Sequence, residues 1–183
     1  MSGTLSRVFG IDLGTTNSCI SYVDEFGKPV VVPNAENERI TPSVVFFDGD
    51  NVIVGTVAKH HSRLYPNAVV ELVKRNMGDP DFLFEHNDKR YRPEEISAFI
   101  LRKVVGDAES ATSEKIQDVV ITCPAWFGIN QREATARPVR SPASMSAASL
   151  MSLPPLPSPT ASNTVRTRPC WFTISAVPTL TLR

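Results

Sequence analysis

Gly10-Ile11-Asp12-Leu13-Gly14-Thr15-Thr16-Asn17-Ser18-Cys19 is the stretch that decides the fold of this chain. Apolar residues lead into it from Val8 and continue after it to Val23, a pattern that predicts a strand, a tight turn and a second strand. Gly14 permits a positive φ and a close approach by a ligand. Free N–H groups and hydroxyls in a turn are natural partners of phosphate oxygens. A carboxylate beside bound phosphate calls for a hydrated Mg²⁺ between the two, which makes Asp12 the candidate metal residue.

On the residues alone, this stretch is equally a hairpin whose glycine and polar side chains only serve the turn. It is not a Walker loop, because no Gly-Lys-Ser/Thr follows and no helix pattern opens after it. The decapeptide nevertheless resembles the first phosphate-binding loop of the seventy-kilodalton heat-shock chaperones of the bacterial DnaK type. Those chaperones are actin-fold ATPases that bind ATP and ADP with Mg²⁺ in a cleft between two lobes.

The resemblance implies an α/β fold, the first lobe of an actin-like (ribonuclease H-like) ATPase domain with a mixed sheet and flanking helices. It also implies which residues form one wall of the phosphate site, with Asp12 reaching Mg²⁺ through water. Those residues are Asp12, Gly14, Thr15, Thr16 and Asn17.

The composition gives no indication of several classes of protein. The formal net charge of the 183 residues is zero, so the charge gives no indication of a nucleic-acid or membrane-surface partner. The three cysteines are far apart and show neither metal-ligand spacing nor a disulfide pattern, which is typical of a reducing cytosol. No stretch approaches the roughly 18 apolar residues of a membrane span. These features predict a cytoplasmic protein.

A change of composition near Arg137 divides the chain. All 19 acidic residues lie at or before Glu133, and all nine glycines lie at or before Gly128. Residues 1–137 are therefore predicted to form the lobe. Residues 138–183, with eight of the 15 prolines, are predicted to be a disordered Pro/Ser-rich tail.

Within the first part, short apolar runs separated by turn residues predict a mixed sheet rather than a parallel one. Pro93-Glu94-Glu95 predicts the start of a helix, because proline suits the first turn and acids favour the positive end of the dipole. The expected elements are strands at 8–11, 19–23, 30–32, 44–47, 52–54 and 119–122, a hairpin within 82–91, and helices over 57–64 and from 93.

Lys74 is the candidate catalytic residue. The segment 67–77 is amphipathic and ends in Lys74-Arg75, which by itself indicates no more than a surface segment with solvated cations. By its order after the loop and by Gly78 beyond it, Lys74 matches the chaperone lysine that reaches the γ-phosphate and the attacking water. A lysine suits that role as a mobile point charge.

Pro124 and Arg132 are the candidate interlobe residues. They match, by resemblance, a proline and an arginine that relay the nucleotide state to the substrate-binding half of the chaperones. Without the resemblance, Pro124 is interpreted as a strand terminator and Arg132 as a charge on a helix surface.

The tail carries traces of chaperone sequence in another reading frame. The Met151 codon ends in G and a Ser152 codon can begin AG, which together give a glutamate codon. Read one base out of phase, residues 148–161 permit Ile-Asn-Glu-Pro-Thr-Ala-Ala-Ala-Ile-Ala-Tyr-Gly, and Thr173 to Ala176 permit Tyr-Asp-Leu-Gly-Gly. Because two family motifs occur in one phase at about the family separation, we infer that the tail is frameshifted.

These observations predict an ATP-binding, ATP-hydrolysing chaperone of the DnaK type in truncated form, defective in hydrolysis and in client binding. The expected partners are unfolded polypeptides, a J-domain co-chaperone and a nucleotide exchange factor. Two alternatives remain open: a non-functional remnant of a disrupted chaperone gene, and a sugar kinase of the same superfamily.

Overall fold

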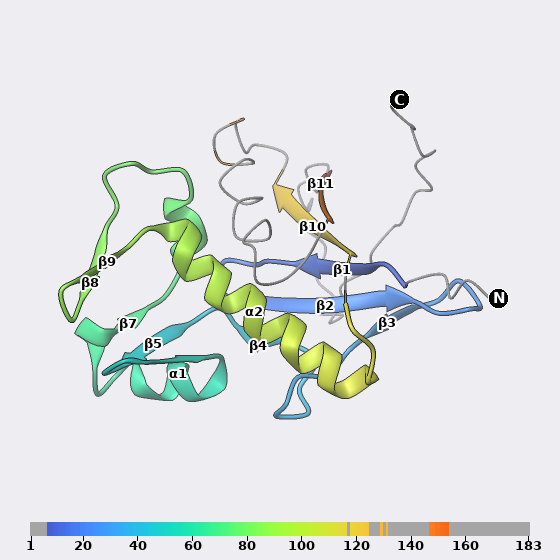
Figure 1. The fold of residues 1–183 in the computed structure, drawn as a ribbon, viewed down its shortest axis with the longest axis horizontal. Coiled ribbons are helices and arrows are strands. Elements are labelled where there is room, and N and C mark those ends of the chain that lie inside the picture. The colour runs from blue at the N-terminus through green and yellow to red at the C-terminus, as the bar shows by residue number, and fades with distance from the viewer. Residues whose placement is uncertain (1–6, 117, 125–128, 130, 132–146, 154–183) are drawn as a thin grey trace, which may run out of the picture.

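The computed structural model describes residues 7–116, 118–124, 129, 131 and 147–153 (Figure 1). Its larger sheet has the strand order β11-β10-β1-β2-β3, with β4 paired to β2. β1 runs parallel to β10 and antiparallel to β2, so the predicted mixed sheet is confirmed. The strands are β1 (Phe9–Asp12), β2 (Asn17–Val23), β3 (Pro29–Val31), β4 (Thr41–Pro42), β10 (Asp118–Pro124) and β11 (Ala147–Leu153).

A second group of elements lies between β4 and β10 in sequence. Its three-stranded sheet has the order β6-β5-β7, and β8 and β9 form a separate hairpin. The predicted strands at 44–47 and 52–54 are confirmed as the antiparallel pair β5–β6, and the predicted hairpin within 82–91 is confirmed as β8–β9. The elements of this group are β5 (Val45–Asp48), β6 (Asn51–Val54), α1 (Thr56–His61), η1 (Pro66–Ala68), β7 (Val69–Val70), η2 (Val73–Asn76), β8 (Phe84–His86) and β9 (Lys89–Tyr91).

Helix α2 (Pro93–Thr112) joins the two groups. Its start follows the predicted pattern, with proline in the first turn and the Glu95 carboxylate accepting a bond from the Arg92 N–H at 2.8 Å. Its apolar face lies across β2 and the strands of the smaller sheet, as the long diagonal helix of Figure 1 shows.

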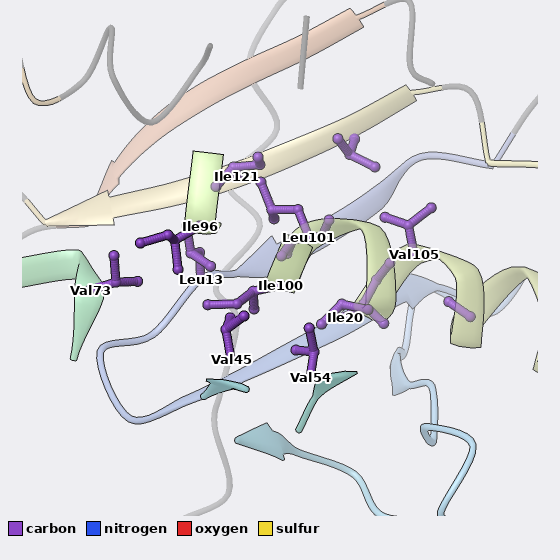
Figure 2. Close-up of a cluster of buried hydrophobic side chains, with 14 of the residues drawn as sticks. Leu13, Ile20, Val45, Val54, Val73, Ile96, Ile100, Leu101, Val105 and Ile121 are labelled. Atoms are coloured by element: carbon purple, nitrogen blue, oxygen red, sulfur yellow. The ribbon is translucent and has the colours of Figure 1, made fainter. Parts of the chain in front are cut away.

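One continuous core therefore connects both sheets (Figure 2). Ile96 and Ile100 on α2 are at most 1% exposed and pack between the larger sheet and β5. Each such side chain stabilises the fold by about 1.5–3 kcal/mol relative to an exposed one. The labelled core side chains are Leu13, Ile20, Val45, Val54, Val73, Ile96, Ile100, Leu101, Val105 and Ile121.

The structure differs from the sequence predictions in two segments of this group. The helix predicted over 57–64 ends at His61, where the Ser62 hydroxyl donates to the Lys59 carbonyl at 2.9 Å and so competes with the next helical bond. The segment 67–77 is not one amphipathic element but a short strand between two 3₁₀ turns. Leu72 has a left-handed backbone, with φ of 58°, and breaks the segment there.

The tail differs from its prediction at one stretch. Ala147–Leu153 forms β11, which pairs in parallel with β10 from Asp118↔Ala147 to Pro124↔Leu153. This stretch has no proline, so no residue in it lacks an N–H for the ladder. The other residues of the predicted 138–183 tail lie outside the described residues.

None of the helices in the described ranges is both long enough and apolar enough to cross a bilayer.

Candidate phosphate site

Asp12 lies at the end of β1, between two neighbouring strands. In register it faces Cys19 of β2 and Thr122 of β10. The Thr122 hydroxyl, on a residue only 2% exposed, donates to Asp12 Oδ1 at 2.9 Å. This bond fixes the orientation of the carboxylate, so Thr122 is a residue of the site that sequence reasoning missed.

Gly14 is required by the tightness of the turn, and its backbone does not have the positive φ that the sequence led us to consider. A Cβ at this position would lie 1.9 Å from the Asn17 carbonyl oxygen. No side chain can occupy that space, so the glycine allows the chain to approach itself rather than to adopt a left-handed conformation.

Two buried serines hold the loop from the inside. The Gly14 N–H donates to Ser18 Oγ at 3.2 Å, and the Ser43 hydroxyl donates to the Gly14 carbonyl at 2.9 Å. The two hydroxyl oxygens are 2.9 Å apart, and the Ser43 N–H donates to the Thr16 carbonyl at 2.8 Å. The sequence patterns did not identify Ser43 as part of the site, because its partners precede it by 25 to 29 residues.

Lys74 reaches the same loop from η2. It is 8% exposed, and its Nζ donates to the carbonyl of Leu13, the residue before Gly14. Burial lowers the pKa of the Lys74 ammonium, while the charges of Asp12 and Cys123 act in the opposite direction. The interpretation of Lys74 as a solvated cation is therefore wrong, whereas the neighbouring Arg75 is exposed.

The structure thus brings together the predicted residues of the phosphate wall and the predicted catalytic lysine. Within the wall, Gly14 and Thr15 are half-buried, and Thr16 and Asn17 are exposed. The predicted interlobe pair is only partly described: the backbone of Pro124 ends β10, and Arg132 lies outside the described residues.

The residues present fit a hydrated magnesium ion better than a fully protein-bound one. Among the described residues, no group of three or more His, Cys, Asp or Glu side chains is placed to hold a metal. Asp12 offers a single half-buried carboxylate, of which one oxygen is engaged by Thr122. One carboxylate, completed by waters and substrate phosphates, is the donor set that Mg²⁺ accepts.

An open groove of about 750 Å³ begins beside Asn17. It carries charges of both signs, and no ion pair joins these side chains to one another within the described part of the chain. Its lining residues are Asn17, Glu38, Ile40, Pro42, Thr56, Lys59, His60, Ser62, Arg63 and Glu71.

Comparison with known proteins adds the family. Residues 8–83 and 79–141 match the family model described as Hsp70 protein. The chain is 48% identical over 129 residues to the "Chaperone protein DnaK" of Thermotoga petrophila and 49% identical over 129 residues to that of Thermotoga neapolitana. Each alignment covers 70% of this chain and 22% of the relative, so the chain spans about a fifth of the length of these relatives.

Proposed function

Because the chain belongs to the Hsp70 protein family, we propose that residues 1–137 form the first lobe of an ATP-binding chaperone domain. The observation that carries the proposal is the position of Lys74, whose Nζ contacts Leu13 next to the Asp12–Asn17 loop although 61 residues separate the two. The bond to the Leu13 carbonyl holds the Lys74 ammonium beside the loop, where a mobile point charge suits phosphate oxygens.

In this proposal each part of the wall has one role. The loop from Gly14 to Asn17 offers N–H groups and hydroxyls to the phosphates of ATP or ADP. Asp12 holds Mg²⁺ through water, and the ion neutralises phosphate charge when bound. Lys74 exchanges the Leu13 carbonyl for a phosphoryl oxygen and stabilises the charge that develops during transfer.

We further propose that these 183 residues bind nucleotide weakly and do not hydrolyse it. The match to the family model ends at residue 141, close to the change of composition after Arg137. Met151-Ser152 stands where the resemblance places a catalytic glutamate, and Thr173-Ile174 stands where it places the aspartate of a second phosphate loop. None of these side chains has the carboxylate that orients water or metal.

Chaperone activity belongs, in this proposal, to a frame-corrected full-length protein in the cytoplasm. Its partners are unfolded polypeptides, a J-domain co-chaperone and a nucleotide exchange factor, with Pro124 and Arg132 relaying the nucleotide state. The break in composition also favours a second candidate, a remnant of a disrupted gene without activity. Resequencing the gene around the codons for 136–138 distinguishes a genomic break from a reading error.

Single-turnover ATP hydrolysis tests the proposal. We expect no turnover above background for the 183-residue chain and restored turnover for the frame-corrected full-length protein. In the latter, Lys74→Ala abolishes turnover and leaves ATP binding largely intact, while Lys115→Ala, at an exposed lysine before β10, changes neither. Normal turnover by Lys74→Ala would show that the lysine is misassigned.

Calorimetry tests the weak binding separately. Too little of the ligand surface is buried by one wall for tight binding, so we expect Mg-ATP to bind the 183-residue chain with a dissociation constant above the micromolar range. Sub-micromolar binding would contradict the view that these residues supply only part of the site.

A further inference from the structure

We propose that Ser43 is the positioning residue of the phosphate loop: it turns the loop carbonyls inward so that the loop N–H groups face the phosphates. The inference rests on the proposed function and adds to it a residue that follows the loop by more than 25 positions. Ser43 lies directly after β4, which pairs with the start of β2 and so brings it beneath the loop.

Ser43 donates two hydrogen bonds, and both go to carbonyl oxygens of the loop. Its hydroxyl donates to Gly14 and its backbone N–H donates to Thr16. Carbonyl oxygens repel phosphate, so a loop that binds phosphate has to direct them elsewhere. Here Ser43 binds two of them, those of Gly14 and Thr16, on the side of the turn that faces it.

The directions of the Gly14 and Thr16 carbonyls also fix the directions of the N–H groups that follow them. In a trans peptide the C=O of one residue and the N–H of the next point in opposite directions, and the described chain has no cis peptide. Because the Gly14 and Thr16 carbonyls point toward Ser43, the Thr15 and Asn17 N–H groups point away from it. Thr15 is half-buried and Asn17 is exposed, so neither residue is enclosed by the fold.

The hydroxyl of Ser43 closes a ring of hydrogen bonds. Since Ser43 Oγ donates to the Gly14 carbonyl, the proton between the two serines comes from Ser18, whose oxygen accepts from the Gly14 N–H. The ring begins and ends on Gly14. Ser18 and Ser43 are each 1% exposed, so water does not replace a missing member and a break costs more than at the surface.

The experiment compares Ser43→Ala with Ser97→Ala by amide hydrogen exchange and by Mg-ATP titration of the ¹⁵N-labelled 183-residue chain. Ser97 is the matched control, because it is fully buried and its hydroxyl has no partner within the described residues. We expect Ser43→Ala to speed exchange at Gly14 more than at the core residue Ile100. We also expect it to weaken Mg-ATP binding about fivefold, while Ser97→Ala does neither. Ser43→Thr, which keeps the hydroxyl, restores both readouts.

The outcomes separate this inference from the proposed function. If the unmodified chain shows no Mg-ATP response, the proposed function fails, and the exchange rates alone decide whether Ser43 orders the loop. If the unmodified chain responds and Ser43→Ala behaves like Ser97→Ala in both readouts, the positioning role of Ser43 is overturned. If Ser43→Ala does not fold, Ser18→Ala interrupts the same ring and carries the same expectations.

Discussion

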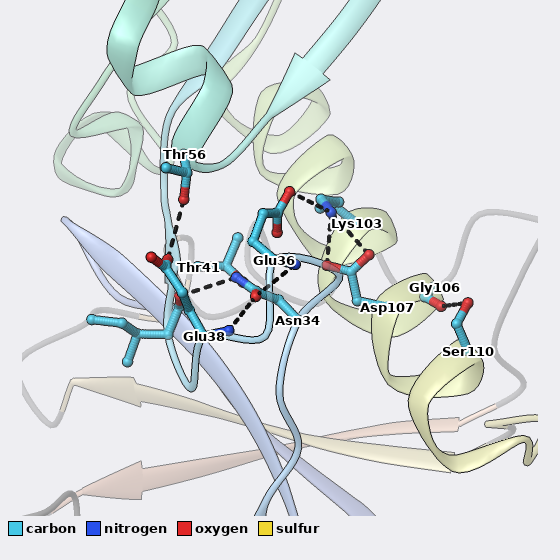
Figure 3. Close-up of polar contacts among 10 residues, drawn as sticks. Asn34, Glu36, Glu38, Thr41, Thr56, Lys103, Gly106, Asp107 and Ser110 are labelled. Carbon is cyan, nitrogen blue, oxygen red and sulfur yellow. Dashed lines mark hydrogen bonds and ion pairs between the residues drawn. The ribbon is translucent and has the colours of Figure 1, made fainter.

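The loops 13–16 and 34–40 both lie next to β4, and they are held in different ways: the first leads into β2, which pairs with β4, and the second leads into β4 itself. The loop 13–16 is fixed by hydrogen bonds to buried groups, from Ser18, Ser43 and Lys74. The loop 34–40 is fixed mainly by exposed contacts, which Figure 3 shows. Both contain several polar contacts, so we expect burial rather than their number to make the first loop the more rigid one.

The second loop is organised by Asn34 and by one lysine of α2. The Asn34 carboxamide oxygen accepts the Glu36 and Glu38 N–H groups at 3.1 and 2.8 Å. Lys103 Nζ lies 3.4 Å from Glu36 and 2.8 Å from Asp107, which ties the loop to the helix (Figure 3). Because Glu38, in this loop, lines the groove beside Asn17, the two loops border the same surface.

The largest effect is expected for Gly14→Ala, which breaks the rigid loop directly. The new methyl group would have to displace the Asn17 carbonyl, so we expect the free energy of unfolding to fall by about 3 kcal/mol. Gly106→Ala is the control, because nothing lies within 4 Å of its added Cβ in the middle of α2. It should raise stability by about 0.5–1 kcal/mol. Equal urea midpoints for the two variants would contradict the tight turn.

The next effect concerns pH and distinguishes the two lysines that hold the loops. Burial lowers the pKa of Lys74 in the folded state, so between that pKa and 10.5 the unfolded chain binds more protons. Stability should therefore rise with pH in this window, by at most about 1.4 kcal/mol per pH unit, and Lys74→Met should remove the rise. If the difference in free energy of unfolding between the unmodified chain and Lys74→Met did not change with pH, the lysine would not be buried.

Lys103 should show the opposite slope. Burial alone would lower its pKa, but its bond to Asp107 and the charges of Asp107 and Glu36 outweigh burial and raise the pKa. Its contribution to the free energy of unfolding is therefore complete below pH 10.5 and is lost as the pH rises through the folded pKa. The free energy of unfolding of the unmodified chain minus that of Lys103→Met, measured by urea denaturation from pH 9 upward, should shrink with pH. A difference that grows with pH would contradict the raised pKa of Lys103.

The smallest effect is expected for Glu36→Gln, in the exposed loop. We expect a loss of about 0.5 kcal/mol or less, which becomes smaller at 1 M salt because partly exposed ion pairs are screened. Glu85→Gln is the control, since its pair with Arg90 is more exposed than the Glu36–Lys103 pair and belongs to the β8–β9 hairpin. If Glu36→Gln lowered the free energy of unfolding as much as Gly14→Ala, the two loops would not differ in how strongly they are held.

Local patterns were sufficient to predict most of the fold. The apolar residues flanking the turn predicted β1 and β2, and Pro93 with its two glutamates predicted the start of α2, because these signals act over a few residues. The same locality limited the site. Asp12 and the loop were identifiable from one decapeptide, whereas the Thr122 bond to Asp12 joins residues 110 positions apart.

Features that depend on tertiary contacts could not be predicted from local patterns. Lys74 has the sequence environment of a surface residue and is buried only because η2 packs beside Leu13. Ser43 became part of the loop only through the pairing of β4 with β2. β11 formed in a tail whose composition indicated no regular structure, because β10 offered an edge with which to pair.

The most direct test of the central claim is a ¹⁵N chemical-shift map of the 183-residue chain during titration with Mg-ATP. If one wall of a phosphate site is present, Mg-ATP binds weakly, and the chemical shifts change in a saturable way at residues 12–18 and around Ser43 and Lys74. Mg-adenosine mixtures, which lack the phosphates, cause none of them. Shifts confined to the groove around Lys59 and Arg63, or equal shifts with adenosine, would contradict the account.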